Sequence, residues 1–306
     1  MSRMSGFRRL MDMTDPATET FLAHRTLLFT VAYELLGSAA DAEDVVQETW
    51  LKWTGVDLSE VRDQRAYLVT IATRQALGRL RVVGRRKETY VGPWLPEPLL
   101  TSPDIAEDVE LADSVSTAML LVLETLTPTE RAVFVLREVF AFDYAEVAEA
   151  VGKTPAAVRQ IAHRAREHVA ARRPRGAPTR EQTKGAMAAF QRAIDEGDVQ
   201  GLLDVLAPDV VLLADGGGVI QAMPRPLVGA GKLVRFYGAV LRAFGPIMTV
   251  EVIEANGAPA FRCFLDGELD GILSMRAENG LITEMYYVRN PEKLSRLTEE
   301  TPLRTR

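Results

Sequence analysis

The chain has 306 residues, of which 47% are hydrophobic and 25% are charged, and its formal net charge is -6. This length predicts two or three domains, and this composition is typical of a soluble globular protein. The acidic balance excludes a surface that is basic all over, so any contact with nucleic acid must be local. Cys263 is the single cysteine, which excludes an internal disulfide and a cysteine-based metal site and fits a reducing cytoplasm.

Neither the N-terminal residues nor the most apolar stretch has the pattern of a membrane-targeting segment. Residues 1–15 hold no apolar run, so they do not have the pattern of a signal peptide. The most apolar stretch, about residues 118–126, is broken by Glu124 and is too short to cross a bilayer. We therefore expect a cytoplasmic protein without a membrane segment, and the sequence indicates no cofactor.

The first part of the chain has apolar residues at helical spacing and predicts helices over about 20–36, 38–53 and 63–87. The third of these becomes steadily more basic towards its end. The stretch that follows, residues 90–104, is rich in proline and reads "YVGPWLPEPLLTSPD". Because proline removes a backbone donor and disfavours helix in the residue before it, this stretch is expected to be an extended linker.

A second group of helices is predicted between residues 105 and 172, beginning with one over about 105–125. Thr127-Pro128-Thr129-Glu130 is a start signal, with a capping threonine, proline in the first turn and glutamate three residues after the cap. Asp143 and Glu146 repeat the cap pattern, and a turn at Gly152 precedes a further start at Thr154-Pro155. Two helices joined in this way have the layout of a helix-turn-helix, whose second helix enters the DNA major groove.

The second of those helices contains "KTPAAVRQIAHRAREHV", residues 153–169, a basic segment in an acidic chain. Its apolar residues fall on one stripe and its polar residues on the other faces. A solvated cationic face would explain the charge alone, but the excess of arginine over lysine favours phosphate and guanine as partners. We therefore expect DNA to be contacted here by Arg159, Gln160, His163, Arg164 and Arg166.

The helix predicted over 38–53 carries an acidic face. "DAEDVVQETWLKW" places Asp41, Asp44 and Glu48 on one side by three- and four-residue steps. An acidic, partly apolar face suits docking to a basic protein partner, and a capped surface helix would show the same spacing. The helix over 63–87 adds a second basic patch, well separated in sequence from the first.

From about residue 180 the pattern changes. Two helices, about 180–196 and 199–206, precede the run "DVVLLADGGG", and a further helix is predicted over about 230–244. Four strand-like runs follow, over 247–255, 258–265, 268–275 and 281–288, separated by Asn-Gly or Asp-Gly pairs. Such pairs are the strongest short hairpin signal, so this half is predicted to be α+β, with helices on one face of a curved antiparallel sheet.

These residues resemble a known family. "DAEDVVQETWLKW" followed by "RAYLVTIATRQALGRLR" is similar to region 2 of the extracytoplasmic-function (ECF) sigma factors of the sigma-70 family, and "LTPTERAVFVLREVFAFDYAEVAEAVGKTPAAVRQIAHRAREHV" is similar to their region 4. "WLPEP", "DGGG" and "NPEKL" further resemble the SigJ-like subgroup, which has a SnoaL-like C-terminal domain. Gly78 stands where the family usually carries Asp, and Val219 where the subgroup typically has Lys.

The resemblance implies four domains or segments and a role for each. Region 2 would span 15–89, the linker 90–104, region 4 105–172 and the cone-shaped, NTF2-like SnoaL domain 180–295. Core RNA polymerase would be bound by Asp41, Glu43, Asp44, Gln47, Glu48 and Trp50. The minus-ten promoter element would be bound by Arg74, Gln75, Arg79 and Arg81, and the minus-thirty-five element by the five residues of the basic helix given above. Interdomain contacts would be made by Trp94, Leu95, Pro96, Asp215, Gly216, Gly217, Gly218, Asn290 and Pro291.

Catalysis by the C-terminal half is a further possibility, because SnoaL-like domains share their fold with ketosteroid isomerases and polyketide cyclases. Such catalysts need a general base and usually an oxyanion donor. All three histidines lie before residue 180, and the remaining candidates, Asp215, Asp270, Tyr237, Tyr286 and Tyr287, form no constellation by their spacing. We therefore expect no enzymatic activity, since a fold alone does not carry one.

The leading hypothesis is a sigma factor that recruits core polymerase to promoters, with a C-terminal domain that modulates activity. An alternative is a ligand-gated helix-turn-helix regulator with a SnoaL-like sensor, and a third possibility is a cyclase or isomerase with an accessory nucleic-acid module. A simple repressor needs neither the acidic helix nor the second basic patch, so these two features favour the sigma factor.

Overall fold

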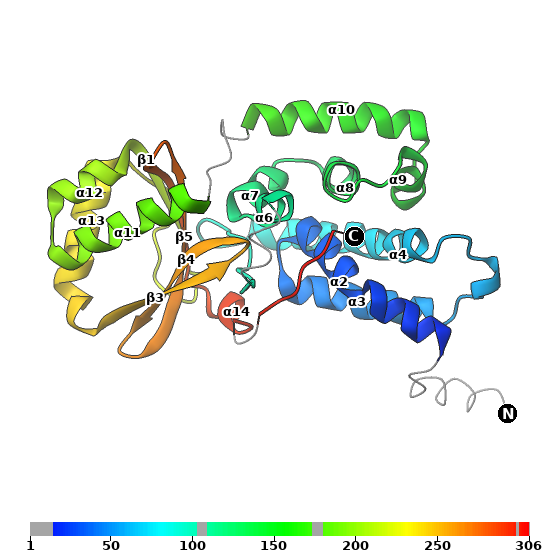
Figure 1. Ribbon diagram of the computed structural model, residues 1–306, viewed down its shortest axis with the longest axis horizontal. Helices are drawn as coiled ribbons and strands as arrows, with labels where there is room; N and C mark the ends of the chain where they lie inside the picture. The colour runs from blue at the N-terminus through cyan, green and yellow to red at the C-terminus, as the bar shows by residue number, and fades with distance from the viewer. Residues whose placement is uncertain (1–14, 103–108, 173–179, 298–299, 306) are drawn as a thin grey trace. The chain divides into compact units, whose positions relative to one another are not determined.

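The structure is a computed structural model that describes residues 15–102, 109–172, 180–297 and 300–305 (Figure 1). The chain forms two compact units. The helical unit comprises Met1–Gly84, Glu124–Ala171 and Pro302–Arg306, and the sheet unit comprises Arg85–Leu123 and Arg172–Thr301. The predicted fold class, helical regions followed by an α+β half, is confirmed.

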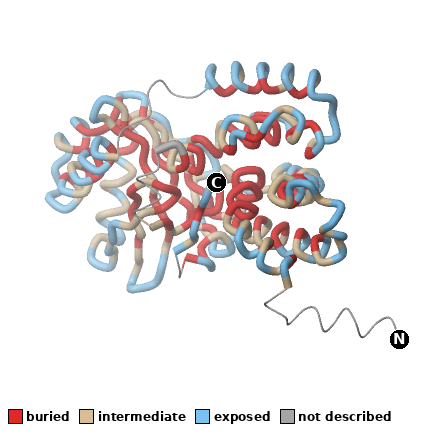
Figure 2. The backbone as a smooth tube through the Cα atoms, turned by 45° about the vertical axis from the view of Figure 1, so that its right-hand side comes forward, coloured by how far each residue is buried: buried red, intermediate tan, exposed pale blue. Residues whose placement is uncertain are grey.

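The helical unit is built from two groups of helices. The first group is α2 (Pro16–Leu36), α3 (Ala39–Trp53), the short 3-10 turn Leu58–Glu60 and α4 (Gln64–Glu88). The second is α8 (Pro128–Phe134), a π-helical turn over Val135–Val139, α9 (Tyr144–Val151) and α10 (Pro155–Arg172). Figure 2 shows α10 with one side buried and the other exposed, which is the pattern expected of an amphipathic surface helix.

The predicted helix boundaries have the expected physical causes. Gly37 ends α2 in the left-handed conformation with φ 66°, and the Ser38 side chain accepts a hydrogen bond from the Asp41 amide at 3.2 Å to cap α3. Both predicted capping boxes form at the starts of α8 and α9. Gly152 ends α9 with φ 66°, a conformation that costs other residues free energy.

Arg131 joins the two helix groups. It is 2% exposed, its Nε donates to the Glu34 carbonyl of α2 at 3.0 Å, and its guanidinium pairs with Glu124. A buried guanidinium is tolerated only with such partners. The two groups are therefore packed together as one unit through α2 and α8.

Gly78 lies in the middle of α4, where an added Cβ would meet nothing within 4 Å. Replacing Gly78 by Ala should therefore raise the free energy of unfolding by about 0.5–1 kcal/mol, because glycine loses more backbone entropy in a helix. Urea unfolding measures this change. Gly152→Ala is the matched control and should lower stability, because Gly152 has φ +66° in equally open space. A loss of stability in both variants would contradict the explanation.

The sheet unit begins with the linker and two short helices. These are α6 (Val109–Val115) and α7 (Thr117–Glu124), so the single helix predicted over 105–125 is wrong in this detail. The helix is interrupted at Ser116. The Ser116 hydroxyl accepts a hydrogen bond from the Met119 amide at 3.1 Å and so caps a new helix. Residues 103–108, at the start of the predicted helix, lie outside the described part of the chain.

The rest of this unit is a six-stranded sheet with helices. The order of strands is β2-β1-β6-β5-β4-β3, with β1 and β6 parallel and the other neighbours antiparallel. The strands are β1 (Leu206–Asp215), β2 (Leu227–Val228), β3 (Met248–Ala255), β4 (Ala258–Leu265), β5 (Glu268–Glu278) and β6 (Leu281–Val288). The helices are α11 (Arg180–Glu196), α12 (Val199–Val205), α13 (Ala230–Phe244) and α14 (Pro291–Leu294), with a 3-10 turn over Gly245–Ile247. The hairpins turn at Asn256, Asp266 and Asn279, each with positive φ and each followed by glycine, as the sequence predicted.

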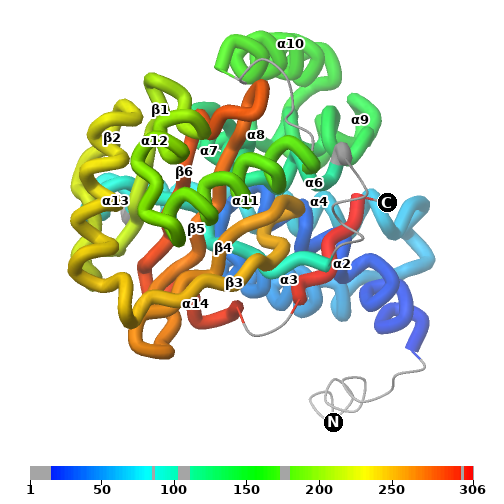
Figure 3. The backbone as a smooth tube through the Cα atoms, turned by 60° about the vertical axis from the view of Figure 1, so that its left-hand side comes forward, coloured from blue at the N-terminus to red at the C-terminus, as the bar shows by residue number. Residues whose placement is uncertain are grey.

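The sheet has a core on each face. One core lies under α11, α12 and α13 and includes Phe190, Leu212 and Met285. The other core includes Leu95 of the linker with Ile272 and Val288, and Leu121 of α7 packs against it. Figure 3 shows α11 lying across the strands of the first face. Because side chains alternate along a strand, neighbouring residues of β1 and β6 serve opposite faces.

Candidate functional site

The exposed side of α10 carries the predicted DNA-binding residues. Val158, Ala162 and Ala165 are fully buried and hold the helix in place. Arg159, Gln160, His163, Arg164 and Arg166 are all exposed. Arg166 pairs with Glu138 at 3.0 Å, and the Arg159 guanidinium lies 5.5 Å from the centroid of the Tyr144 ring. The arrangement leaves a basic face open to an anionic partner, and its edge is held by local contacts.

The acidic face of α3 is occupied in part by a basic residue of α4. Arg79 pairs through Nε with Asp41 at 2.8 Å, through Nη1 with Glu48 at 3.1 Å and through Nη2 with Asp44. These three carboxylates raise the pKa of Arg79, against the opposing effect of burial. Residues predicted to bind the polymerase and a residue predicted to bind the minus-ten element therefore meet on one surface.

Neighbouring residues extend this network. Gln75 donates to Glu48 at 2.7 Å and accepts from Lys52 at 2.8 Å, while Arg74 donates to the Glu149 carbonyl at 2.7 Å. Glu43 pairs with Arg25 at 2.7 Å, and the Trp50 ring packs 4.9 Å from that of Phe21. Gln47 and Arg81 are exposed.

A third group of residues fixes the linker to the sheet unit, and we name it the linker clamp: Tyr90, Leu95, Asp215, Asn290 and Lys293. Asp215, at the end of β1, is 0% exposed. Its Oδ1 accepts from the Tyr90 hydroxyl at 2.5 Å, and its Oδ2 accepts from the Leu95 amide at 2.9 Å and from Lys293 Nζ at 2.7 Å. A buried carboxylate is stable only when it is paired and hydrogen-bonded in this way.

The other members of the clamp complete its hydrogen bonds. Lys293 Nζ also donates to the Leu95 carbonyl at 2.5 Å, and Asn290 Nδ2 donates to the Tyr90 hydroxyl oxygen at 2.9 Å. Burial and the hydrogen bond to Asp215 raise the pKa of Tyr90, which stays protonated. Two ammonium groups contact the Trp94 ring, since Lys87 Nζ lies 3.3 Å and Lys293 Nζ 4.2 Å from the ring centroid.

The three glycines after Asp215 are required by space. A Cβ on Gly216 would lie 2.1 Å from the Ile220 carbonyl oxygen, and one on Gly217 would lie 2.4 Å from Asn290 Nδ2. Gly218 has φ +73°, and its Cβ would lie 3.1 Å from Val91. The absence of side chains therefore lets this turn approach both the linker and the Asn290 corner.

The linker has a second attachment at the β3–β4 turn. Leu99 donates to Asn256 Oδ1 at 3.0 Å and accepts from the Asn256 amide at 2.9 Å, and Leu100 forms an antiparallel bridge with Ala255. Asn256 Nδ2 donates to the Val115 carbonyl at 2.9 Å. Residues around Leu99 thus lie along the edge strand β3, so the linker is extended as predicted but is also paired.

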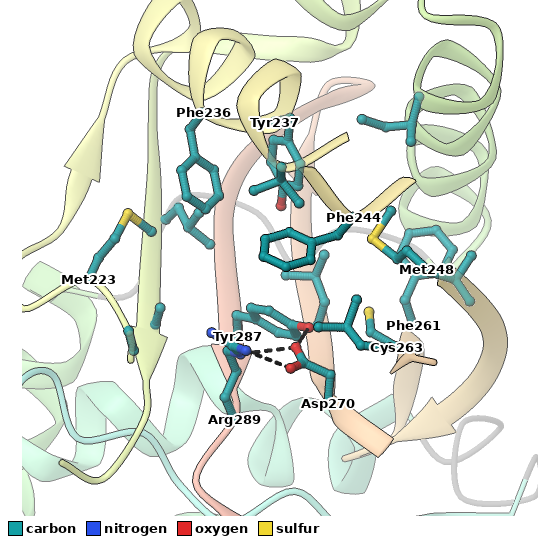
Figure 4. Close-up of a pocket in the computed structure, with 18 of the residues that line it drawn as sticks. Met223, Phe236, Tyr237, Phe244, Met248, Phe261, Cys263, Asp270, Tyr287 and Arg289 are labelled. Carbon is teal, nitrogen blue, oxygen red and sulfur yellow. Dashed lines mark hydrogen bonds and ion pairs between the residues drawn. The ribbon is translucent and has the colours of Figure 1, made fainter. Parts of the chain in front are cut away.

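The sheet unit also contains a cavity of about 560 Å³ between the sheet, α11 and α13 (Figure 4). Its walls are mostly apolar. At one end Asp270 accepts from Arg289 Nε at 2.9 Å and Nη2 at 2.5 Å and from the Tyr287 hydroxyl. Burial raises the pKa of Tyr287, so its hydroxyl remains neutral.

Cys263 lines this cavity, and burial raises the pKa of its thiol to about 12 from an ordinary value of 9.0. We predict that iodoacetamide at pH 8 alkylates the folded protein about a thousandfold more slowly than the urea-unfolded protein, because the thiolate is the reacting form. Quenched-time-point mass spectrometry measures both rates. Equal rates would show that the thiol is neither buried nor protonated.

Two family models match parts of the chain. The family model for sigma-70 region 2 matches residues 20–86, and that for sigma-70 region 4 matches residues 116–169. The ECF RNA polymerase sigma factor SigJ of Mycobacterium tuberculosis is 36% identical over 292 residues, which cover 90% of this chain and 92% of that protein. The chain belongs to the ECF RNA polymerase sigma factors.

One further relative and one solved structure match most of the sigma factor. The probable ECF RNA polymerase sigma factor SigI of the same organism is 32% identical over 295 residues, covering 95% of this chain and 99% of that protein. The crystal structure of M. tuberculosis SigJ superposes with a TM-score of 0.74 at 33% identity, covering 90% of this chain and 97% of that chain. The C-terminal half of this sigma factor therefore has the predicted SnoaL-like fold.

Several residues of the sigma factor that bind the linker or form part of it were not predicted as site residues from the sequence. Tyr90 stands at the first position of the predicted linker, and Lys293 lies inside the "NPEKL" motif, but neither was singled out. Asn256 was assigned only a turn, although its side chain binds Leu99 of the linker through Oδ1 and Val115 of α6 through Nδ2. A tyrosine and a tryptophan in a proline-rich linker were the available signal, because exposed aromatic residues there need a partner.

Among residues 15–102, 109–172, 180–297 and 300–305, no cluster of three His, Cys, Asp or Glu side chains could hold a metal ion. Within the same ranges, none of the helices combines the length and apolar character needed to span a bilayer.

Proposed function

We propose that this sigma factor binds core RNA polymerase through the acidic face of α3 and promoter DNA through α4 and α10. The observation that carries the proposal is the exposed row of arginine, glutamine and histidine on α10, in a chain that also matches sigma-70 region 2. Arginine and glutamine forks suit base edges, and further arginines suit phosphates. A simple helix-turn-helix repressor has no use for the region 2 helices, so they favour this function over the ligand-gated regulator.

The acidic face has to change partners in this scheme. In the free protein, Arg79 forms ion pairs with Asp41, Asp44 and Glu48. Basic residues of the polymerase would replace Arg79 there, and the released guanidinium would then be available to minus-ten DNA. Exchange between two ion-paired states costs little where charges remain partly hydrated.

The C-terminal unit is proposed to act without catalysis, by holding the linker that connects region 2 to region 4. The support for this proposal is the linker clamp, in which Asp215 and Lys293 bind Tyr90 and Leu95 of the linker. Restraint of this linker limits the separations that the two DNA-binding regions can reach.

Reconstituted transcription tests the function. Core polymerase with the full-length protein should start transcripts on a library of random promoter templates where core alone does not, and the selected templates give the promoter motif. Core polymerase that forms no complex with the protein would overturn the proposal.

Arg164→Ala tests the DNA-binding face. Loss of one phosphate contact should weaken binding and lower the slope of log K against log salt by about one unit. Filter binding on a selected promoter, with the polymerase holoenzyme and a salt series, measures the slope. Arg235→Ala, an exposed arginine on α13 of the sheet unit, is the matched control and should leave the slope unchanged. An unaltered slope for Arg164→Ala would argue against phosphate contact there.

A further inference from the structure

The proposed function leaves the 560 Å³ cavity of the sheet unit without a role. Its size is within the range of small-molecule sites, about 300–1,000 Å³. Its walls include Phe190, Leu212, Phe236, Phe244, Phe261 and Leu273. We propose that the cavity binds an uncharged, largely apolar ring compound, and that its occupancy strengthens the linker clamp. An effect of this coupling on transcription rests on the proposed function, whereas ligand binding and the coupling itself do not.

The charged groups at the cavity explain why the ligand is uncharged. Asp270 and Arg289 neutralise one another, and both Asp270 oxygens already accept hydrogen bonds. Arg289 Nη1 also donates to the Gln221 carbonyl at 2.6 Å. Asp195 is exposed at the rim, where water screens it. A charged ligand would therefore lose its hydration without gaining an opposite charge.

Tyr237 provides one polar contact for the ligand. Its side chain hangs from α13, and Figure 4 shows its hydroxyl directed into the cavity. Within the described ranges of the chain no hydrogen bond to this hydroxyl is found. Burial raises the pKa of Tyr237, so the group is a neutral donor. A single carbonyl or hydroxyl on an otherwise apolar ligand would satisfy it.

The coupling to the linker clamp follows from the alternation of side chains along two strands. At the end of β1, Ala214 lines the cavity and Asp215 binds the linker. At the end of β6, Arg289 borders the cavity and Asn290 binds Tyr90. Each pair consists of adjacent residues, so one backbone segment serves both sites.

The loop after the glycine turn makes the same connection. Ile220, Ala222 and Met223 line the cavity. The Ile220 amide donates to the Gly216 carbonyl at 3.0 Å, within the turn that contacts the linker. A ligand packed on this loop favours the loop conformation that closes the clamp, and linkage requires that the clamp gain the corresponding free energy.

Nile red, a neutral polycyclic dye with one carbonyl, is the probe for the site. Titration of the full-length protein should give saturable fluorescence enhancement. Val240→Trp, which fills the cavity from α13, should weaken binding at least about tenfold, and Tyr237→Phe about fivefold for one lost hydrogen bond. Ala239→Trp, at the preceding and exposed position of α13, should bind as the wild type does. Equal loss in Val240→Trp and Ala239→Trp, or no saturable binding, would overturn the site.

The anionic dye 8-anilinonaphthalene-1-sulfonate tests the charge argument. It should bind the cavity at least about tenfold more weakly than Nile red, because its sulfonate has no free cation to pair with. Binding as tight as that of Nile red, and sensitive to Val240→Trp, would overturn the uncharged class of ligand.

Hydrogen exchange tests the coupling. Saturating Nile red should slow exchange in the peptide covering residues 90–100 in the wild type and leave it unchanged in Val240→Trp. Dye binding without slower exchange would overturn the coupling while leaving the site. None of these three experiments contains polymerase or DNA, so failure of the proposed transcription function would be seen separately.

Discussion

Replacing Asp215 by Ala is expected to lower the free energy of unfolding of the sheet unit by about 3–5 kcal/mol, the usual result of removing one partner from a buried ion pair. Asp215 is 0% exposed, and its loss leaves Lys293, whose side chain is 12% exposed, without its carboxylate. The Leu95 amide and the Tyr90 hydroxyl lose their acceptor at the same time. Urea unfolding followed by circular dichroism measures the loss.

Asp209→Ala is the matched control, because Asp209 lies on the same strand and is exposed. It should change stability by less than about 0.5 kcal/mol. Hydrogen exchange of residues 90–100 should be fast in Asp215→Ala and slow in Asp209→Ala. If the two variants were equally stable and equally protected, Asp215 would not hold the linker.

The folded elements were largely predictable because local rules decide them. Thr127 and Glu130, Asp143 and Glu146, and Gly37 each mark a helix end by a hydrogen bond to residues close in the chain. The hairpins follow from the same kind of signal, since Asn or Asp before glycine tolerates positive φ. Such signals need no knowledge of the tertiary structure.

The unpredicted features depend on contacts between distant residues. The break at Ser116 and the short strand β2 have weak local signals. Asn256 binds Leu99 of the linker and Val115 of α6, which both lie more than a hundred positions away in the sequence. The ion pairs of Arg79 with α3 could not be foreseen either, because spacing along one helix does not show which helix faces it. The cavity has the same origin, since its walls come from α11, α13 and five strands.

The predicted site residues divide in the same way. Region 4 residues such as Arg159 and Arg164 are exposed where a helical wheel places them, and their roles in DNA binding stay a prediction. The motifs around Trp94, Asp215 and Asn290 were connected by resemblance alone, and the structure supplies the physical reason, a buried carboxylate with three donors from the linker and α14.

Arg131→Met is expected to lower the free energy of unfolding of the helical unit by about 3–5 kcal/mol. The side chain is 2% exposed and donates from α8 to the Glu34 carbonyl of α2 at 3.0 Å, while it pairs with Glu124. Methionine fills similar volume but satisfies neither oxygen. The stability of Arg131→Lys should lie between those of the wild type and Arg131→Met. An ammonium group keeps the charge, but it cannot donate in both directions as the guanidinium does. Arg62→Met, at an exposed arginine before α4, is the control.

The position of Arg131 gives this prediction a second measurable result. Region 2 contributes α2 and region 4 contributes α8, so the guanidinium is a contact between the two regions within the helical unit. Native-state hydrogen exchange should therefore show lost protection in both α2 and α8 of Arg131→Met, and unchanged protection in the sheet unit. Loss confined to α8 would mean that Arg131 stabilises only its own helix, and that the two regions are held together by apolar packing alone.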